Sequence, residues 1–295
     1  SLSLGCFSRL PEVEVRMFRQ PKQVMVSLLA YGEAPRVRLP WDSRFTPAML
    51  RGHLELHPRL SFWNQTTGEY AIGGRWRGRR DVGAVLETSK GNSQSLLVET
   101  LVTRFREDGF RAVVLSQDEA DAACSLYLAC GWRKLDRLLV YRLTDAWPYD
   151  RQKPTDLAVS SFHPGDLAGL TSLDREAFPW LWWNDPSDFL AYSSSENVAV
   201  FLARAGGRLL GYVSYSSRNN RGHLDRLAVR PASAGKGYGS WLLDFAVRRM
   251  WQSGIRDIGL TTQETNLAAQ GLYQRFGFVK TGETHEVIGQ ELSKT

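Results

Sequence analysis

The chain has 295 residues, of which 43% are hydrophobic and 11% aromatic, a composition that supplies packed cores and excludes an intrinsically disordered protein. No stretch approaches the roughly 18 uninterrupted apolar residues of a membrane-spanning helix. The formal net charge of +6 favours an anionic partner, either nucleic acid or a phosphorylated cofactor. The basic residues are dispersed rather than gathered in a block, so we expect no nucleic-acid partner.

The first residues, SLSLGCFSRLPEVEV, lack the charged and apolar regions of a signal peptide, and we expect a soluble cytoplasmic protein without a membrane partner. The cysteines, Cys6, Cys124 and Cys130, form no CxxC pair and have no histidine at metal-ligand spacing. They therefore predict neither a disulfide framework nor a metal site, and they fit a reducing compartment. We interpret Cys124 and Cys130 as small buried residues of one helix.

Taken in chain order, three segments of the first half are similar in sequence to segments of the second half. Three segments match their counterparts in the same order and at nearly constant spacing, which indicates a duplicated fold. The longest match aligns AACSLYLACGW with AAQGLYQRFGF. The matching pairs are 122–132 with 268–278, 89–97 with 235–243, and 108–115 with 253–260.

A polar segment separates the two halves. It reads TDAWPYDRQKPTD and carries Pro148 and Pro154, which is typical of a linker. We therefore predict an N-terminal domain at 1–145, a linker at 146–156 and a C-terminal domain at 157–295, each domain of ordinary size.

The second half alternates β-rich segments with two helical patterns. The apolar residues Leu243, Ala246, Val247 and Met250 recur at helical spacing and predict one buried helix face. The pattern predicts an α/β domain whose central sheet is largely an antiparallel meander with one helical crossover. The predicted strands are 197–204, 208–215, 223–229, 255–262 and a last strand from 278, and the predicted helices are 239–251 and 266–276.

Three alternate glycines lie between the strand that ends at Val229 and the helix that follows it. Gly235, Gly237 and Gly239 have no Cβ atom, so backbone amides there can approach an anion closely. Unpaired amides and the positive end of the helix dipole favour negative charge at this point. The loop is either an anion site or a structural turn.

Two common phosphate motifs fit this loop poorly. A Walker loop requires Ser or Thr after its GK pair, and here Gly237 follows Lys236. A dinucleotide fingerprint requires glycine at the position of Ser240, and it belongs to a parallel βαβ unit.

The arrangement resembles the GCN5-related N-acetyltransferase (GNAT) family in two motifs. The family's pyrophosphate loop, V-x-P-x-x-[Q/R]-G-x-G-x-[G/A], is matched except that Ala234 stands at the Gln or Arg position. Its second signature is matched from Asn266 to Phe278. The resemblance covers about 160–285 and, in eroded form, about 70–142. It implies two tandem GNAT-like domains, each a mostly antiparallel mixed sheet flanked by helices.

The resemblance implies that acetyl-CoA lies in a splay between the strand ending at Val229 and the strand near Leu260. The loop would hold the pyrophosphate, and Asn266 would hydrogen-bond the pantetheine arm. Ala234 would weaken this grip, and Lys236 would supply charge. The implied cofactor-binding residues are Leu227, Ala228, Val229, Ala234, Gly235, Lys236, Gly237, Tyr238, Gly239, Ser240, Asn266 and Tyr273.

The activity implied is transfer of an acetyl group from acetyl-CoA to a primary amine by direct attack, which requires a base and a proton donor. Tyr273 stands at the family's tyrosine position and would protonate the departing thiolate. The candidate bases are Asp225, expected on the same strand face as Leu227 and Val229, and Glu264. Each carboxylate is equally well explained as one partner of a structural ion pair. His223 is a further candidate, although a surface role at a strand start also fits it.

An aromatic segment precedes the second strand of the C-terminal half. Phe178, Trp182 and Trp183 are interpreted either as an aromatic wall of the acceptor site or as a core wedge. In the family the corresponding helices and loop cover the acceptor.

The first half lacks the residues that carry the chemistry. Ser89, Ser93 and Ala120 stand where the second half has Gly235, Gly239 and Asn266, so we expect a degenerate copy. The alternative function is a non-catalytic CoA-binding sensor or interaction module. The acceptor amine stays open, and we expect a monomer or a homodimer.

Overall fold

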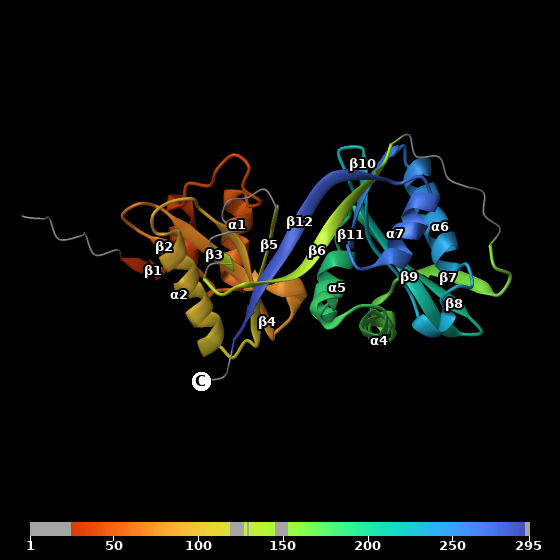
Figure 1. The fold of residues 1–295 in the computed structure, drawn as a ribbon, viewed down its shortest axis with the longest axis horizontal. Helices are drawn as coiled ribbons and strands as arrows, with labels where there is room; N and C mark the ends of the chain where they lie inside the picture. Colours follow the sequence, from red (N-terminus) through yellow and green to blue (C-terminus); the bar gives the residue numbers. More distant parts are fainter. Residues whose placement is uncertain (1–24, 119–126, 129, 145–152, 293–295) are drawn as a thin grey trace, which may run out of the picture.

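The computed structural model describes residues 25–118, 127–128, 130–144 and 153–292, and Figure 1 shows their arrangement. Within these residues, twelve strands form one continuous sheet in the order β1-β2-β3-β4-β5-β12-β6-β11-β10-β9-β8-β7. The α/β class with a mostly antiparallel mixed sheet flanked by helices is confirmed. Cys6, Cys124, Ala120 and residues 146–152 of the predicted linker lie outside the described residues.

Within the described residues each half has six strands and one helical crossover, and the halves differ in their other helices. The N-terminal half contains β1 (Val26–Leu28), η1 (Tyr31–Arg36), α1 (Pro47–Leu56), β2 (Ser61–Asn64), β3 (Tyr70–Arg75), η2 (Trp76–Gly78), β4 (Val82–Thr88), α2 (Gln94–Glu107), β5 (Ala112–Asp118) and β6 (Arg133–Leu143).

The C-terminal half contains the five strands and two helices predicted for it, with ends shifted by a few residues. They are β8 (Val198–Ala205), β9 (Arg208–Arg218), β10 (Arg221–Val229), α6 (Tyr238–Gln252), β11 (Asp257–Gln263), α7 (Leu267–Arg275) and β12 (Val279–Glu291). Its further elements are β7 (Leu157–Ser161), η3 (Pro164–Asp166), α4 (Leu167–Ala177), η4 (Trp180–Trp182), α5 (Pro186–Ser193) and η5 (Pro231–Ser233).

One repeat was missed in the sequence and is evident in the fold. Helices α1 and α5 both begin with a proline, after N-cap residues Thr46 and Asp185 whose side chains accept from backbone amides. The upstream dipeptides Pro40–Trp41 and Pro179–Trp180 stand at the same distance before these helices. This spacing was a readable signal for the duplication.

Each half has one parallel strand pair joined by a helical crossover. Strand β10 runs parallel to β11 with α6 between them, and β4 runs parallel to β5 with α2 between them. The other strand pairs of the described sheet are antiparallel. The antiparallel meander with one helical crossover, predicted for the C-terminal half, is therefore confirmed.

The last strand of each half pairs with the other half. Strand β6, from the N-terminal half, is antiparallel to β11, while β12, from the C-terminal half, is antiparallel to β5 and to β6. Figure 1 shows these two long strands crossing the centre of the molecule. The parallel pair of each half is thus flanked by a strand supplied by the other half.

Helix α6 supplies one side of the C-terminal core. Its residues Leu243, Ala246, Val247 and Met250 are fully buried, as their spacing predicts, and they pack on the sheet. Burial of each large apolar side chain contributes about 1.5–3 kcal/mol.

Cys130 is exposed in a turn, after the end of the local helix. The interpretation of Cys130 as a buried helical residue is therefore wrong.

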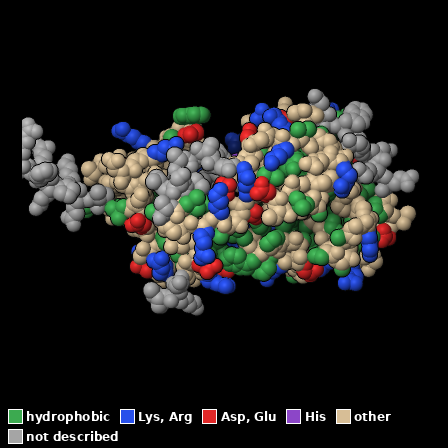
Figure 2. Space-filling model, in the orientation of Figure 1, with side chains coloured by type: hydrophobic (Ala, Val, Ile, Leu, Met, Phe, Trp, Pro, Cys, Tyr) green, Lys and Arg blue, Asp and Glu red, His purple; other side chains and the backbone are tan. Residues whose placement is uncertain are grey.

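On the face drawn in Figure 2, basic side chains are interleaved with acidic ones. No helix in the described part of the chain is long and apolar enough to cross a membrane.

Candidate functional site

The parallel strands β10 and β11 separate halfway along their length. Their ladder runs from the pair Arg221 and Asp257 to the pair Leu224 and Leu260 and then ends. Beyond that rung β10 stays paired to β9 as far as Val229, and β11 stays paired to β6. The two strands therefore leave a splay whose inner edges carry backbone groups that do not pair across it.

A bulge at Asp225 lies where the splay begins. The register between β10 and β9 skips this residue, so the side-chain alternation reverses there. Leu227 and Val229 pack against the α6 side, whereas the Asp225 side chain accepts from Tyr192 of α5 on the opposite side. The expectation that Asp225 shares a face with Leu227 and Val229 is therefore wrong, because strand parity predicts faces only in the absence of a bulge.

The loop from Val229 to α6 has the backbone of an anion cradle. Gly235 and Gly237 have φ values of 77° and 83°, in the left-handed region that favours glycine. A Cβ at either position would meet nothing within 4 Å, so both face open space. Gly237 is the N-cap of α6, and no side chain caps the helix there. The amides of the first helical turn are thus available to an anion.

The other predicted loop residues differ in their roles. Gly239 lies inside α6, and a Cβ there would be 3.7 Å from Val229 and 3.8 Å from Leu272, which is ordinary contact. Ala234 and Lys236 are exposed. Tyr238 donates its hydroxyl to Asp156 at 3.1 Å. Two further members of the predicted set are Ala228, which is buried, and Ser240, which is half-buried.

Helix α7 follows the splay and carries the second motif. Asn266 is its N-cap, and its side-chain oxygen accepts from the Ala269 amide at 3.1 Å. Tyr273 is 7% exposed and lies among aromatic rings, with Tyr141 of β6 at 6.4 Å and Phe278 at 5.9 Å between ring centroids. Burial raises the pKa of the Tyr273 hydroxyl, so this group stays protonated at neutral pH. Within the described residues it makes no hydrogen bond.

Asp225 is the centre of a polar cluster on the other side of the sheet. Its carboxylate accepts from the Tyr192 hydroxyl and from Ser216 Oγ at 3.0 Å, and it lies 2.7 Å from His223 Nδ1. Burial and the charge of Asp225 raise the pKa of Tyr192, which keeps this hydroxyl a donor. His223 is half-exposed. Tyr192 and Ser216 had no signal in the sequence, because only the strand pairing and α5 bring them to Asp225.

His223 lines a surface cavity of about 940 Å³. It pairs across the sheet with Gly259, and the absence of a side chain at Gly259 leaves room beside the imidazole. The rim carries both signs of charge, since Asp257 pairs with Arg142 and Arg221 while Glu283 lies nearby. The cavity is therefore polar, and it lies beside the part of β10 and β11 that is still paired, before the splay begins.

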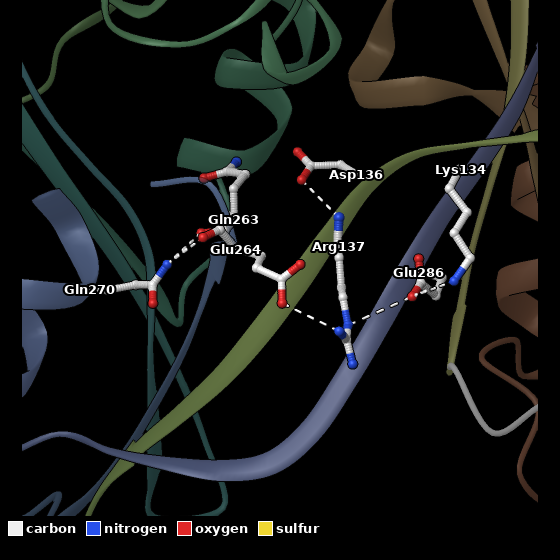
Figure 3. Close-up of polar contacts among 7 residues, drawn as sticks. All are labelled: Lys134, Asp136, Arg137, Gln263, Glu264, Gln270 and Glu286. Carbon is white, nitrogen blue, oxygen red and sulfur yellow. Dashed lines mark hydrogen bonds and ion pairs between the residues drawn. The ribbon is translucent and has the colours of Figure 1, made fainter. Parts of the chain in front are cut away.

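Glu264, the second predicted base, belongs to the junction between the halves. Its side chain is 49% exposed and pairs with Arg137 of β6 at 3.3 Å. Figure 3 shows Arg137 between Glu264 and the buried Glu286 of β12, which also accepts from Lys134 at 3.1 Å. Gln270 of α7 donates to the Glu264 carbonyl at 2.7 Å. These contacts tie α7 and the end of β11 to the strand that the N-terminal half supplies.

The aromatic segment packs mainly between the halves. Trp182 is 7% exposed, belongs to one buried cluster with residues of β4, β5 and β12, and donates its indole N–H to Asp136 at 2.6 Å. Phe178 lies under the Arg226 guanidinium, 3.9 Å from it. Trp183 is half-buried, with its ring 5.7 Å from the Arg79 guanidinium. The wedge interpretation therefore describes Trp182.

A buried ion pair between Arg226 and Asp174 holds the aromatic segment in place, because Arg226 also binds the Trp182 carbonyl. Arg226 Nε donates to Asp174 Oδ1 at 2.7 Å, and Asp174 is fully buried. Tyr212 also donates to Asp174, and Arg226 donates a further bond to the Trp182 carbonyl. Pairing with Tyr212 and Asp174 raises the pKa of Arg226 against the effect of burial, so the guanidinium stays charged. This network was not predicted, since its members are far apart in the sequence.

Among the described residues of the N-terminal half, apolar side chains occupy the positions that match this site. Aligned on the last parallel rung of each half, Ala84 and Val114 occupy the positions of His223 and Gly259. The bulge is kept at Leu86, which replaces Asp225, but β4 ends only two residues later, at Thr88. Trp182 shares one buried cluster with these apolar residues.

Comparisons with known proteins agree with this geometry. Residues 167–278 match the family model described as the acetyltransferase (GNAT) family. A mycothiol acetyltransferase of Streptomyces avermitilis is 31% identical over 133 residues, covering 44% of this chain and 37% of the relative. One from Arthrobacter sp. is 26% identical over 210 residues, covering 62% and 61%. The matched region spans less than half of the length of the first relatives.

Two solved structures share the fold along nearly the whole chain. A GCN5-related N-acetyltransferase from Sphaerobacter thermophilus has a TM-score of 0.62 at 18% identity, covering 93% of this chain and 97% of the other. A tandem GNAT protein from the clavulanic acid biosynthesis pathway has a TM-score of 0.64 at 12% identity, covering 92% and 99%. The expectation of two tandem GNAT-like domains is confirmed.

Proposed function

Since residues 167–278 of this chain form a GNAT-family domain, we propose that the C-terminal half binds acetyl-CoA and transfers its acetyl group to a primary amine. The observation that carries the proposal is the splay between β10 and β11 beside a left-handed glycine loop at a helix N-terminus. The matching rungs of the N-terminal half carry apolar residues.

The residues present fit the coenzyme. Open space at Gly235 and Gly237 and the uncapped first turn of α6 suit a pyrophosphate. Each hydrogen bond from a backbone N–H to a charged phosphate oxygen would contribute about 1.5–3 kcal/mol. From Leu227 to Val229 the edge of β10 that faces β11 is unpaired, and its backbone groups suit the pantetheine amides. The side-chain N–H₂ of Asn266 is also available to them, because its oxygen is the atom that caps α7. The methyl group of Ala234 offers a phosphate no hydrogen bond, and exposed Lys236 supplies positive charge instead.

The base that the geometry favours is His223, with Asp225 as its positioning residue. An ionised carboxylate only accepts hydrogen bonds, so contact with Asp225 places the imidazole proton on Nδ1 and leaves Nε2 with a free lone pair. Asp225 itself has three hydrogen-bond partners and Glu264 is held by Arg137. Both carboxylates, predicted as candidate bases, therefore act here as partners of other groups.

The proton donor that fits is Tyr273. Its side chain is 7% exposed, and its hydroxyl is protonated at neutral pH and has no hydrogen-bond partner in the described part of the chain. When acetyl-CoA is bound, the thioester supplies the acetyl group and a thiolate leaves. Tyr273 lies on α7, beside the splay, and would give its proton to that thiolate.

The acceptor amine would occupy the cavity beside His223, because this cavity reaches the rung of His223 and Gly259, which lies one rung before the last paired one at the splay. Its mixed charge suits a polar amine, and Phe178 and Trp183 stay candidates for contact with an apolar part of it. Trp182 would act through its position, by holding the segment between the halves.

A screen of free-thiol release from acetyl-CoA over amines of different classes tests this function. We expect turnover with a subset of amines and its loss by about 10²-fold or more in Tyr273→Phe. Tyr31→Phe, an exposed tyrosine in the N-terminal half, is the matched control and should keep full activity. Tight CoA binding with no thiol release across the panel would favour a CoA-binding module, the alternative that alanine in place of Gln or Arg at position 234 supports.

A further inference from the structure

The loop between β3 and β4 of the N-terminal half packs directly against α5 of the C-terminal half. The Arg77 carbonyl accepts the Asp185 amide proton at a donor–acceptor distance of 3.0 Å. A Cβ on the next residue, Gly78, would lie 2.8 Å from the Cβ of Asp188, so glycine allows this close approach. Arg77 therefore belongs to the contact between the halves, on the side of the sheet that α5 covers.

The backbone of Arg77 has a conformation that an arginine seldom adopts. Its φ is 52°, in the left-handed region, and Gly78 follows with φ 70°. Among the described residues, the other two non-glycine residues with positive φ are Asn219 and Asn220, and asparagine tolerates this region. Tertiary contacts, rather than local preference, thus hold Arg77 in this conformation, as is common for residues at functional sites.

The Arg77 guanidinium lacks a polar partner. Within the described residues its side chain makes no hydrogen bond or ion pair, and its Nε is buried. The ring of Trp182 lies 5.7 Å from Cζ. Burial, and then the charge of Arg226, lower the pKa of Arg77 to about 10, so the group stays charged at neutral pH. Because buried charges in proteins are normally paired, this guanidinium is available to an anionic group from outside the chain.

Two further polar groups without partners lie on the segment that Arg77 contacts. The Asp188 carboxylate is half-buried and makes no hydrogen bond or ion pair in the described part of the chain. Asn184 is 6% exposed, and its Oδ1 is buried with no hydrogen-bond partner there. A guanidinium requires an acceptor, whereas a carboxylate and an amide oxygen require donors. A molecule with an acidic group and N–H or O–H groups beside it supplies both kinds.

These groups lie next to the cluster of His223 and Asp225. Asp188 and Tyr192 are one turn apart in α5, so their side chains occupy the same face of the helix. Tyr192 donates its hydroxyl to Asp225, which contacts His223. A molecule whose amine reaches His223 can therefore extend along α5 toward Arg77.

We propose that Arg77, supplied by the N-terminal half, binds a carboxylate of the acceptor, so that the acceptor belongs to the class of amino acids and short peptides. This inference rests on the proposed acetyl transfer. The guanidinium presents its N–H groups in a planar fork that matches a carboxylate, while Asp188 accepts from a donor of the same molecule. The N-terminal half then takes part in the reaction by selecting the acceptor.

The first test compares acceptors that differ only in this charge. The series consists of ω-amino acids of increasing chain length, beginning with β-alanine, each paired with its neutral amide and assayed by thiol release from acetyl-CoA. For at least one chain length we expect the acid to exceed its amide in kcat/KM by about tenfold or more, chiefly through KM. Arg77→Gln should abolish this preference. Arg80→Gln, which changes an exposed arginine of the same loop, should keep it.

Three results of this assay would overturn the proposal. They are equal rates for acids and amides at every chain length, a preference for the acid that survives in Arg77→Gln, and a loss in Arg77→Gln that is equal for acid and amide. The last result would mean that Arg77 supports the fold of the site without contacting the acceptor.

A binding experiment decides the carboxylate site independently of turnover. Thiol release from none of the amines would contradict the acetyl transfer itself, so the same acids and amides are also titrated into the ¹⁵N-labelled full chain. The signal observed is the indole N–H of Trp182, whose ring lies beside Arg77. We expect a saturable shift with an acid at millimolar concentration, and none with its amide or in Arg77→Gln. A wild-type chain in which no acid moves this signal contradicts the carboxylate site, as does the same shift in Arg77→Gln.

Discussion

His223 Nδ1 lies 2.7 Å from Asp225 Oδ1, and the two residues are close because both side chains point to the α5 side of β10. The bulge at Asp225 then places the next residue, Arg226, on that side too, where it binds Asp174. One extra residue in the strand thus brings a histidine, its carboxylate and a buried guanidinium to the same face, at the point where the parallel strands part.

Replacing His223 by Gln should remove the base while keeping the amide within reach of Asp225. We expect kcat/KM for the amine to fall by about 10²–10⁴-fold. Binding of CoA, measured by calorimetry, should change little. A His223→Gln enzyme with an unchanged kcat/KM would exclude the histidine as the base.

Gly237→Ala should weaken coenzyme binding, because a side chain at φ 83° strains the backbone by about 1–2 kcal/mol and the loop would relax away from its cradle shape. Gly239→Ala is the matched control, since Gly239 is helical and its added Cβ would meet only ordinary contacts. Calorimetric titration with CoA should show at least a several-fold loss for the first variant and little for the second. Equal CoA affinities of the two variants would contradict a role of the glycine loop in binding the coenzyme.

Cutting the chain at the linker should leave neither half folded alone. A fragment of residues 157–295 lacks β6, so β11 would present an open edge and β12 would lose both partners. We expect it to aggregate, and co-expression with residues 1–145 to restore a soluble complex, as read by gel filtration. A monomeric, well-dispersed spectrum of 157–295 by itself would contradict this.

Asp174→Asn should be strongly destabilising, because it leaves the buried Arg226 charge without its carboxylate. We expect a loss of about 3–5 kcal/mol in the free energy of unfolding, measured with denaturant. Asp166→Asn provides the control: it removes a more exposed pair with Arg204 and should cost less than about 1 kcal/mol.

The N-terminal half should lose stability in mild acid through His57. Burial, and then the charges of His53 and Arg75, lower the pKa of His57 from 6.5 to about 4. Because the folded value lies below the unfolded one, the stability that a neutral His57 contributes is present above about pH 6.5 and is lost as the pH falls toward 4. The thermal midpoint of His57→Gln should therefore fall less between pH 7 and 5 than that of the wild type. His163→Gln should behave like the wild type.

The sequence by itself determined the class of fold, the duplication and the glycine loop. Helical spacing from Leu243 to Met250 and alternating β-rich segments report local structure directly, since each residue's burial follows from its neighbours along the chain. The left-handed glycines 235 and 237 are equally local, because only glycine adopts that backbone without strain.

Tertiary structure alone decided how these parts combine. A bulge changes no residue type, so nothing in HLDRLAV revealed that Asp225 turns away from Leu227. The exchange of β6 and β12 depends on which open strand edge each one meets in space, and the hydrogen bond from the Asp185 amide to the Arg77 carbonyl joins a helix start of one half to a loop of the other. Periodicity reports the face of a strand, whereas the partner across that face is chosen by packing of the whole chain.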